Sequence, residues 1–150
     1  MKAPHYALSV RQPWAWAIIH GGKDIENRSW SARGPNIKHH VNDGGHVCIH
    51  AAKGMTRAEY REAYEFMESL GVSCPPAADL LRGGIIGSVS IVRVTKKSSS
   101  PWFFGPLGLV LTDPKEMEFI PSKGRLGYFR WQPDSEESIP KPNRWMLKKI

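Results

Sequence analysis

The sequence predicts an α+β domain with a small, twisted, barrel-like mixed sheet flanked by two or three helices. Short segments of alternating apolar and polar residues recur between glycine- and proline-rich turns, a pattern typical of strands. Only two or three segments show the spacing of a helix. The chain has 150 residues, which is the size of one domain and enough to bury a core without disulfides or metal.

The strand predictions rest on side chains that alternate between two faces. The strongest strand contains Gly87, which predicts a bulge or a close approach of another backbone. Asp113-Pro114 separates two further strands, because proline cannot donate a hydrogen bond within a sheet. The predicted strands span residues 5–11, 24–30, 46–52, 85–95, 107–111, 117–120 and 126–131.

Three segments are predicted to be helical. Residues 13–19 begin with proline, which is favoured at the first helical position, and are followed by two glycines that end the helix. This helix is apolar nearly all round, so we expect it to be buried. The clearest helix begins at Thr56, where Thr56 and Glu59 form a capping box, and ends at Gly71. A shorter helical piece is expected at residues 74–82.

Charge and aromatic content narrow the class of partner. The chain carries a net charge of +7 and six tryptophans. Basic charge with abundant aromatic rings suits RNA or a nucleotide, with DNA as a further possibility, better than a membrane. We expect one domain over residues 1–150, with a core at about 5–131 and a Pro/Ser/acidic loop and basic tail at 132–150.

Other classes of protein fit the sequence poorly. The longest apolar stretch is too short to span a bilayer. Residues 1–6 lack the apolar run of a signal peptide. Cys48 and Cys74 give no disulfide framework, which predicts free thiols and a cytoplasmic protein.

The segment with the most chemical information is residues 21–28, which match the pattern G-x-K-x-x-E-x-R. On a strand, Glu26, Arg28 and Trp30 point to one face, and Lys23 lies near the end of that face. The two cations could hold a phosphate while a base packs on the indole and Glu26 accepts a hydrogen bond or moves a proton. Alternatively, Glu26 only pairs with Lys23 or Arg28 to satisfy a half-buried surface.

Together with the preceding run Leu-Ser-Val-Arg-Gln-Pro-Trp-Ala-Trp at residues 8–16, this motif closely resembles the ASCH domain of the PUA-like superfamily. Later segments, at residues 49–51, 84–87, 102–106 and 123–129, agree with it. The resemblance implies a β-barrel surrounded by helices, with a cleft lined by the motif that takes RNA, DNA or a nucleotide.

The same resemblance keeps two alternatives open. The first is a hydrolase acting on RNA or modified nucleosides, either ribonuclease or amidohydrolase-like, in which Lys23 and Glu26 would be catalytic. The amidohydrolases of the family use a lysine, a threonine three residues later and a glutamate from another strand; here Lys23 matches the lysine and Glu26 stands in place of the threonine. The second is a protein-interaction domain in a transcription- or translation-related assembly.

Further residues are candidates for the ligand site. Polar contacts to the ligand are expected from Gln12 and His50, although His50 could equally be structural. Lys53 could reach a phosphate or remain solvated, and Trp102 could be a stacking residue or part of the core. Besides Lys23, Glu26 and Arg28, the expected ligand-binding residues are Gln12, Trp14, Trp30, His50, Lys53 and Trp102.

One strand carries three side chains of the kinds that bind zinc. His46, Cys48 and His50 share a face, and His39 or His40 could complete a tetrahedral zinc site. The alternative is that the residues between them, Val47, Ile49 and Ala51, form the core face of an ordinary strand. We expect no metal and no cofactor.

Overall fold

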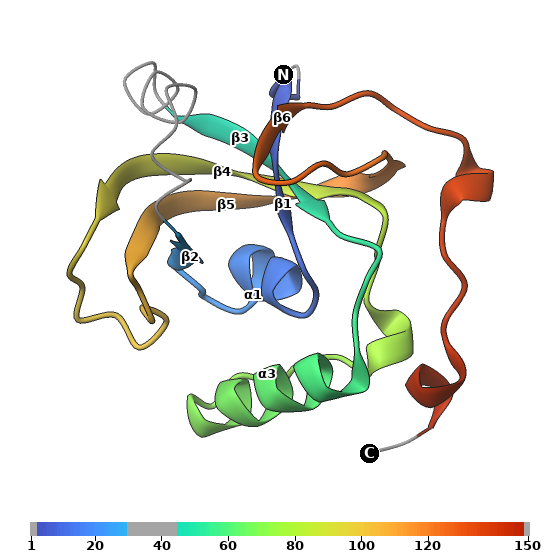
Figure 1. The fold of residues 1–150 in the computed structure, drawn as a ribbon, viewed down its shortest axis with the longest axis horizontal. Helices are drawn as coiled ribbons and strands as arrows, with labels where there is room; N and C mark the ends of the chain where they lie inside the picture. The colour runs from blue at the N-terminus through green and yellow to red at the C-terminus, as the bar shows by residue number, and fades with distance from the viewer. Residues whose placement is uncertain (1–2, 30–44, 149–150) are drawn as a thin grey trace.

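The computed structural model describes residues 3–29 and 45–148, and a mixed six-stranded sheet forms its centre (Figure 1). The strand order is β2-β5-β4-β3-β1-β6. Only β1 and β3 run parallel, and every other neighbouring pair is antiparallel. The sheet curls into a half-barrel, which confirms the predicted α+β class. The strands are β1 (Tyr6–Val10), β2 (Ile25–Arg28), β3 (His46–Ala51), β4 (Gly84–Thr95), β5 (Leu107–Pro121) and β6 (Tyr128–Arg130).

One prediction about the strands is wrong. Asp113-Pro114 does not separate two strands, because β5 runs through both residues without a break. The neighbours of this pair, residues 112 and 115, face Ser90 and Ser88 of β4, so Asp113 and Pro114 together oppose one residue. This is a β-bulge, where a proline breaks no regular ladder bond. The bulge predicted at Gly87 is confirmed by a shift in register between Ile85 and Gly87.

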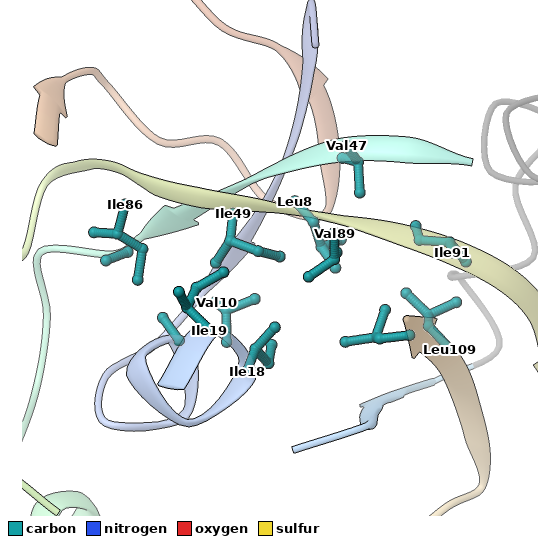
Figure 2. Close-up of a cluster of buried hydrophobic side chains, with 13 residues drawn as sticks. Leu8, Val10, Ile18, Ile19, Val47, Ile49, Ile86, Val89, Ile91 and Leu109 are labelled. Atoms are coloured by element: carbon teal, nitrogen blue, oxygen red, sulfur yellow. The ribbon is translucent and has the colours of Figure 1, made fainter. Parts of the chain in front are cut away.

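Helix α1 (Trp14–His20) lies between the sheet and helix α3 (Arg57–Ser69) (Figure 1). Ile18 and Ile19 of α1 pack on Leu8, Ile49 and other side chains of the sheet, as Figure 2 shows. Ala17, on another side of α1, belongs to the cluster that includes α3. The predicted burial of this helix is therefore confirmed, and its cause is that α1 is covered by two layers.

Helix α3 begins as the capping box predicts. The Thr56 hydroxyl accepts a hydrogen bond from the Glu59 amide at 3.1 Å, and the Glu59 carboxylate accepts one from the Thr56 amide at 3.0 Å. Tyr60, Ala63 and Met67 form the buried stripe of α3. The helical piece predicted at residues 74–82 is only one 3₁₀ turn, η2 (Ala77–Asp79). None of the helices among the described residues is long and apolar enough to cross a membrane.

The segment after β6 runs down one side of the domain to α3 (Figure 1). It contains two 3₁₀ turns, η3 (Glu136–Ser138) and η4 (Arg144–Leu147). Met146 is 3% exposed and joins the cluster around α3. The buried Arg82 donates hydrogen bonds to the carbonyl oxygens of Lys53 and Lys141, which holds this segment against the domain. Core packing therefore extends past residue 131, the end of the predicted core.

Candidate functional site

The motif places one carboxylate between two cations on β2 and the turn before it. Glu26 Oε1 lies 3.4 Å from Lys23 Nζ, and Glu26 Oε2 lies 3.2 Å from Arg28 Nη2. The exposed fractions of the side chains are 2% for Lys23, 12% for Glu26 and 22% for Arg28. Glu26 thus pairs with both cations in a buried triad, which is the structural alternative that the sequence left open.

Lys23 is held inside the protein by several contacts. Its ammonium also donates a hydrogen bond to the carbonyl oxygen of Ile25. Nζ lies 5.6 Å from the ring centroid of Trp14 and 5.8 Å from that of Trp102, within the range of a cation–π interaction. Burial lowers the pKa of Lys23, and the charge of Glu26 opposes this shift. The ammonium is therefore committed to contacts within the protein.

Arg28 links β2 to β1. Its Nη2 donates a hydrogen bond to the carbonyl oxygen of Ser9 at 2.8 Å, in addition to the contact with Glu26. The Nε of Arg28 is buried and has no hydrogen-bond partner within the described part of the chain. The Nη2 group of Arg28 is consequently committed to contacts within the protein.

A cavity of 560 Å³ opens beside this triad, between β2 and α3. Its volume is within the range of about 300–1,000 Å³ that is usual for small-molecule sites. The motif supplies its floor and α3 supplies one wall. The lining residues are Trp14, Lys23, Glu26, Asn27, Glu59, Glu62, Phe66 and Phe104.

Aromatic rings make up much of the cavity wall. The ring centroid of Phe66 lies 5.1 Å from that of Phe104 and 5.5 Å from that of Trp102. Trp102 also meets Trp14 edge to face, at 6.4 Å. Trp102 is 5% exposed and therefore belongs to the core behind the wall, whereas Phe104 is 61% exposed at its rim. Such a wall offers a ring face on which a flat ligand could stack.

Asn27 fixes the loop that carries Phe104. Its Oδ1 accepts hydrogen bonds from the amides of Phe104 at 2.7 Å and Gly105 at 3.1 Å. Its Nδ2 donates to the carbonyl oxygen of Trp102 at 2.9 Å. Because Asn27 lies next to Glu26 on β2, the same strand positions both the carboxylate and the aromatic rim.

Carboxylates outnumber cations on the cavity lining. Glu59 is paired with Arg11 through two contacts of 2.6 Å, and this hydrogen bonding lowers the pKa of Glu59 to about 2. Glu62 is exposed and forms no ion pair with any described residue. With Glu26 they make three carboxylates against Lys23. This lining favours a hydrogen-bond donor over a phosphate.

Three of the predicted site residues lie away from this cavity. Gln12 is 1% exposed; it donates to the Leu81 carbonyl at 2.7 Å and accepts from an amide of α1 at 2.9 Å. His50 is also 1% exposed, and its Nε2 donates to the carbonyl oxygen of Ser122 at 2.7 Å. Lys53 is exposed and is not part of the lining. Trp30 lies outside the described residues. The structure brings together Trp14, Lys23, Glu26, Arg28 and Trp102.

Sequence reasoning missed five residues of the lining, on α3, on β2 and on the loop before β5. Glu59, Glu62 and Phe66 are spaced three and four residues apart, so they share one flank of α3 beside its buried stripe. That spacing in the sequence indicates that the three side chains lie on the same side of the helix. No sequence pattern indicates the position of Phe104, because it depends on the hydrogen bonds of its loop to Asn27.

The zinc alternative finds no support among the described residues. No three histidine, cysteine or acidic side chains in residues 3–29 and 45–148 come together as metal ligands. Val47, Ile49 and Ala51 form the core face of β3, and Cys48 packs on the opposite side of the sheet. His39 and His40, the candidates for a further zinc ligand, lie outside the described residues.

Comparison with known proteins assigns the family. No curated protein matches this sequence significantly. The family model for the ASCH domain matches residues 8–121, which include every residue that lines the cavity. This family is part of the PUA-like superfamily, and its members are generally RNA-binding domains. A match over three quarters of the chain, together with the half-barrel sheet and helices α1 and α3, shows that the chain belongs to the ASCH domain family.

Proposed function

We propose that this protein binds single-stranded RNA or a nucleotide by taking one base into the cavity between β2 and α3. The observation that carries the proposal is an aromatic wall next to a buried carboxylate. Both lie within residues 8–121, which match the ASCH domain, and the chain has a net charge of +7. Stacking of a base on an aromatic side chain contributes about 1–3 kcal/mol. Trp14, Phe66 and Phe104 are the rings available for it.

Glu26 would select the base by its hydrogen-bond donors. A carboxylate has about four lone-pair sites, and each oxygen of Glu26 uses one of them on a cation. The remaining sites can accept from an exocyclic amino group, as carboxylates do with the amino group of cytosine. We therefore expect cytosine, adenine or guanine in the cavity in preference to uracil, whose edge is mostly carbonyl oxygen.

The roles of the predicted residues change accordingly. Lys23 would hold Glu26 in place, because its ammonium is buried against that carboxylate. Arg28 would do the same from the other side, through the contact of its Nη2 with that carboxylate. Neither would serve as the main phosphate contact. Gln12, His50 and Lys53 are left out of the binding site.

The test compares two labelled oligoribonucleotides, eight cytidines and eight uridines, by fluorescence anisotropy. We expect the cytidine octamer to bind about tenfold more tightly or better, since a hydrogen bond to a charged group contributes about 1.5–3 kcal/mol. Phe104→Ala should weaken binding at least fivefold, while Leu126→Ala, a matched loss of a fully exposed apolar side chain, should leave it unchanged. Absence of salt-dependent binding below about 100 μM would reject the proposal, because phosphate contacts release counterions.

One observation favours hydrolysis of RNA or of an acylated nucleoside as a second candidate function. Lys23 lines the cavity, its pKa is lowered by burial, and it lies 3.4 Å from Glu26. A lysine with a lowered pKa beside a carboxylate can activate water as a general base. Incubation with labelled RNA and an N-acylated cytidine tests this function. Unchanged substrates, or equal turnover by Lys23→Met and Glu26→Gln, would exclude it.

A further inference from the structure

A second cavity, of 360 Å³, lies on the other flank of α3. Its walls are α3, the segment that leads into η2, and η4 with the residue after it. Two of its lining residues, Trp145 and Lys148, lie after residue 121, where the family match ends. The lining residues are Arg57, Tyr60, Arg61, Tyr64, Cys74, Pro76, Ala77, Trp145 and Lys148.

This second cavity is basic where the first is acidic. Arg57, Arg61 and Lys148 line it, and no carboxylate does. Arg57 and Arg61 are exposed and form no ion pair or hydrogen bond with any described residue, although Glu62 and Glu65 border them on the solvent side. Arg57 and Arg61 are four residues apart, and two like charges at that spacing repel each other on a helix. An anionic ligand would relieve this repulsion.

Aromatic rings form the rest of the wall. Tyr60 is buried, and its hydroxyl donates a hydrogen bond to the carbonyl oxygen of Pro75 at 2.6 Å. Its ring centroid lies 5.9 Å from those of Tyr64 and Trp145, which are both half-buried. Burial raises the pKa of Cys74 to about 11, so its thiol adds no negative charge. The cavity thus combines three cations with two partly exposed rings.

The two cavities separate charge across one helix. Glu59 and Glu62 face the first cavity, and Arg57 and Arg61 face the second. A helix with its side chains is about 10–12 Å across. Four nucleotides span about 10 Å even at the 3.4 Å stacked spacing of a duplex strand. A strand that inserts a base into the first cavity is therefore long enough to bring a phosphate to the second.

We propose that the cavity between α3 and η4 is a second site, which binds a nucleotide through its phosphate. Arg57 and Arg61 bind the phosphate oxygens, and Tyr64 and Trp145 contact the attached ring. The site takes either a nucleotide unit of the RNA strand held by the first cavity, which rests on the proposed function, or a free nucleotide. It also supplies the phosphate contacts that Lys23 and Arg28 do not offer.

The test uses the full chain with the double variant Arg57→Ala/Arg61→Ala. Its matched control is Arg93→Ala/Arg125→Ala, which removes the same charge at exposed positions that line neither cavity. The first probe is the labelled cytidine octamer, titrated at several salt concentrations. We expect the arginine variant to bind at least tenfold more weakly, and its slope of log K against log salt to shrink by about 0.7, because one phosphate contact is lost. The control should keep the wild-type slope.

The second probe is 5′-AMP, followed by quenching of tryptophan fluorescence, with Trp145→Phe as a check on the reporter. Quenching that is lost in both Arg57→Ala/Arg61→Ala and Trp145→Phe identifies the free nucleotide as a ligand. An effect seen only with the octamer identifies the RNA strand. If neither probe distinguishes the arginine variant from its control, the second site is wrong, while the cytidine preference and the Phe104→Ala result still decide the proposed function separately.

Discussion

Replacing Glu26 with glutamine tests the triad on which the site is built. The substitution keeps the size of the side chain but leaves Lys23, which is 2% exposed, without its counter-charge. Removing one partner of a buried ion pair costs about 3–5 kcal/mol. Arg28 is 22% exposed and can reach water, so the expected loss is near the lower end, about 3 kcal/mol.

That loss is large compared with the stability of a domain. Globular proteins unfold with about 5–15 kcal/mol, and 1 kcal/mol corresponds to about 2–4 °C in Tm for a chain of this size. The variant should therefore melt about 6–12 °C below the wild type. Urea denaturation followed by circular dichroism at neutral pH gives the free energy directly. Glu118→Gln, at an exposed position on β5, is the control for loss of one negative charge.

The pH dependence separates this explanation from a simple packing defect. Burial holds the pKa of Lys23 below 10.5, so between its folded pKa and 10.5 the unfolded chain binds more protons and stability rises with pH. Glu26 raises the pKa of Lys23, and without it that pKa falls further. The rise then begins at lower pH in the variant. We expect the difference in unfolding free energy to shrink between pH 7 and 10.

Two results would refute this reasoning. One is a Glu26→Gln protein as stable as the wild type at pH 7. The other is a stability loss that stays constant or grows toward pH 10, which would mean that the ammonium of Lys23 is not the buried charge left without a partner. The double variant Lys23→Met/Glu26→Gln removes that charge altogether and should recover much of the stability.

Three further substitutions test other parts of the structure. Asn27→Ala removes three hydrogen bonds to the cavity loop, which should cost about 2 kcal/mol in urea denaturation and speed amide exchange at Phe104. Glu59→Gln removes the ion pair with the half-exposed Arg11, which should lower the free energy of unfolding by about 1 kcal/mol. The pKa of Glu59 is lowered from 4.5 to about 2, so this difference from the wild type should be complete above pH 4.5 and disappear as the pH falls toward 2. Gly87→Ala would place a Cβ 2.5 Å from a carbonyl oxygen of β5, so we expect about 1–3 kcal/mol of destabilisation by overpacking, seen as a lower Tm.

Local signals predicted the fold where neighbours in sequence determine the structure. The capping box at Thr56 uses atoms three residues apart, and it marks the start of α3 as expected. The bulge at Asp113-Pro114 depends instead on how β5 pairs with β4, across about 25 residues. A proline inside an apolar segment looks the same whether the strand ends or bulges, so sequence alone could not choose.

The residues of the candidate site also include some that the sequence pattern predicts and others that depend on tertiary packing. Lys23, Glu26 and Arg28 are close in sequence, and the pattern alone indicates that they meet. Phe104 and Glu62 reach the same cavity from a loop and a helix that come together only because α1 packs between the sheet and α3. For β3, the alternation of side chains correctly predicts which residues share a face. It does not predict which of the two faces adjoins the cavity, so the placement of His50 could not be predicted.

The charge of the motif also has a consequence for how this domain could bind RNA. A pattern with two cations and one carboxylate suggests surplus positive charge, yet Glu26 contacts both cations and Lys23 is buried. Of the other two acids of the lining, Glu59 is paired with Arg11, and Glu62 adds a carboxylate that favours a base edge over a phosphate. An RNA strand bound there needs its phosphate contacts from cations outside the motif. Arg57 and Arg61 meet that need on the opposite flank of the same helix, so the net charge of +7 is relevant to binding mainly through residues that the motif does not contain.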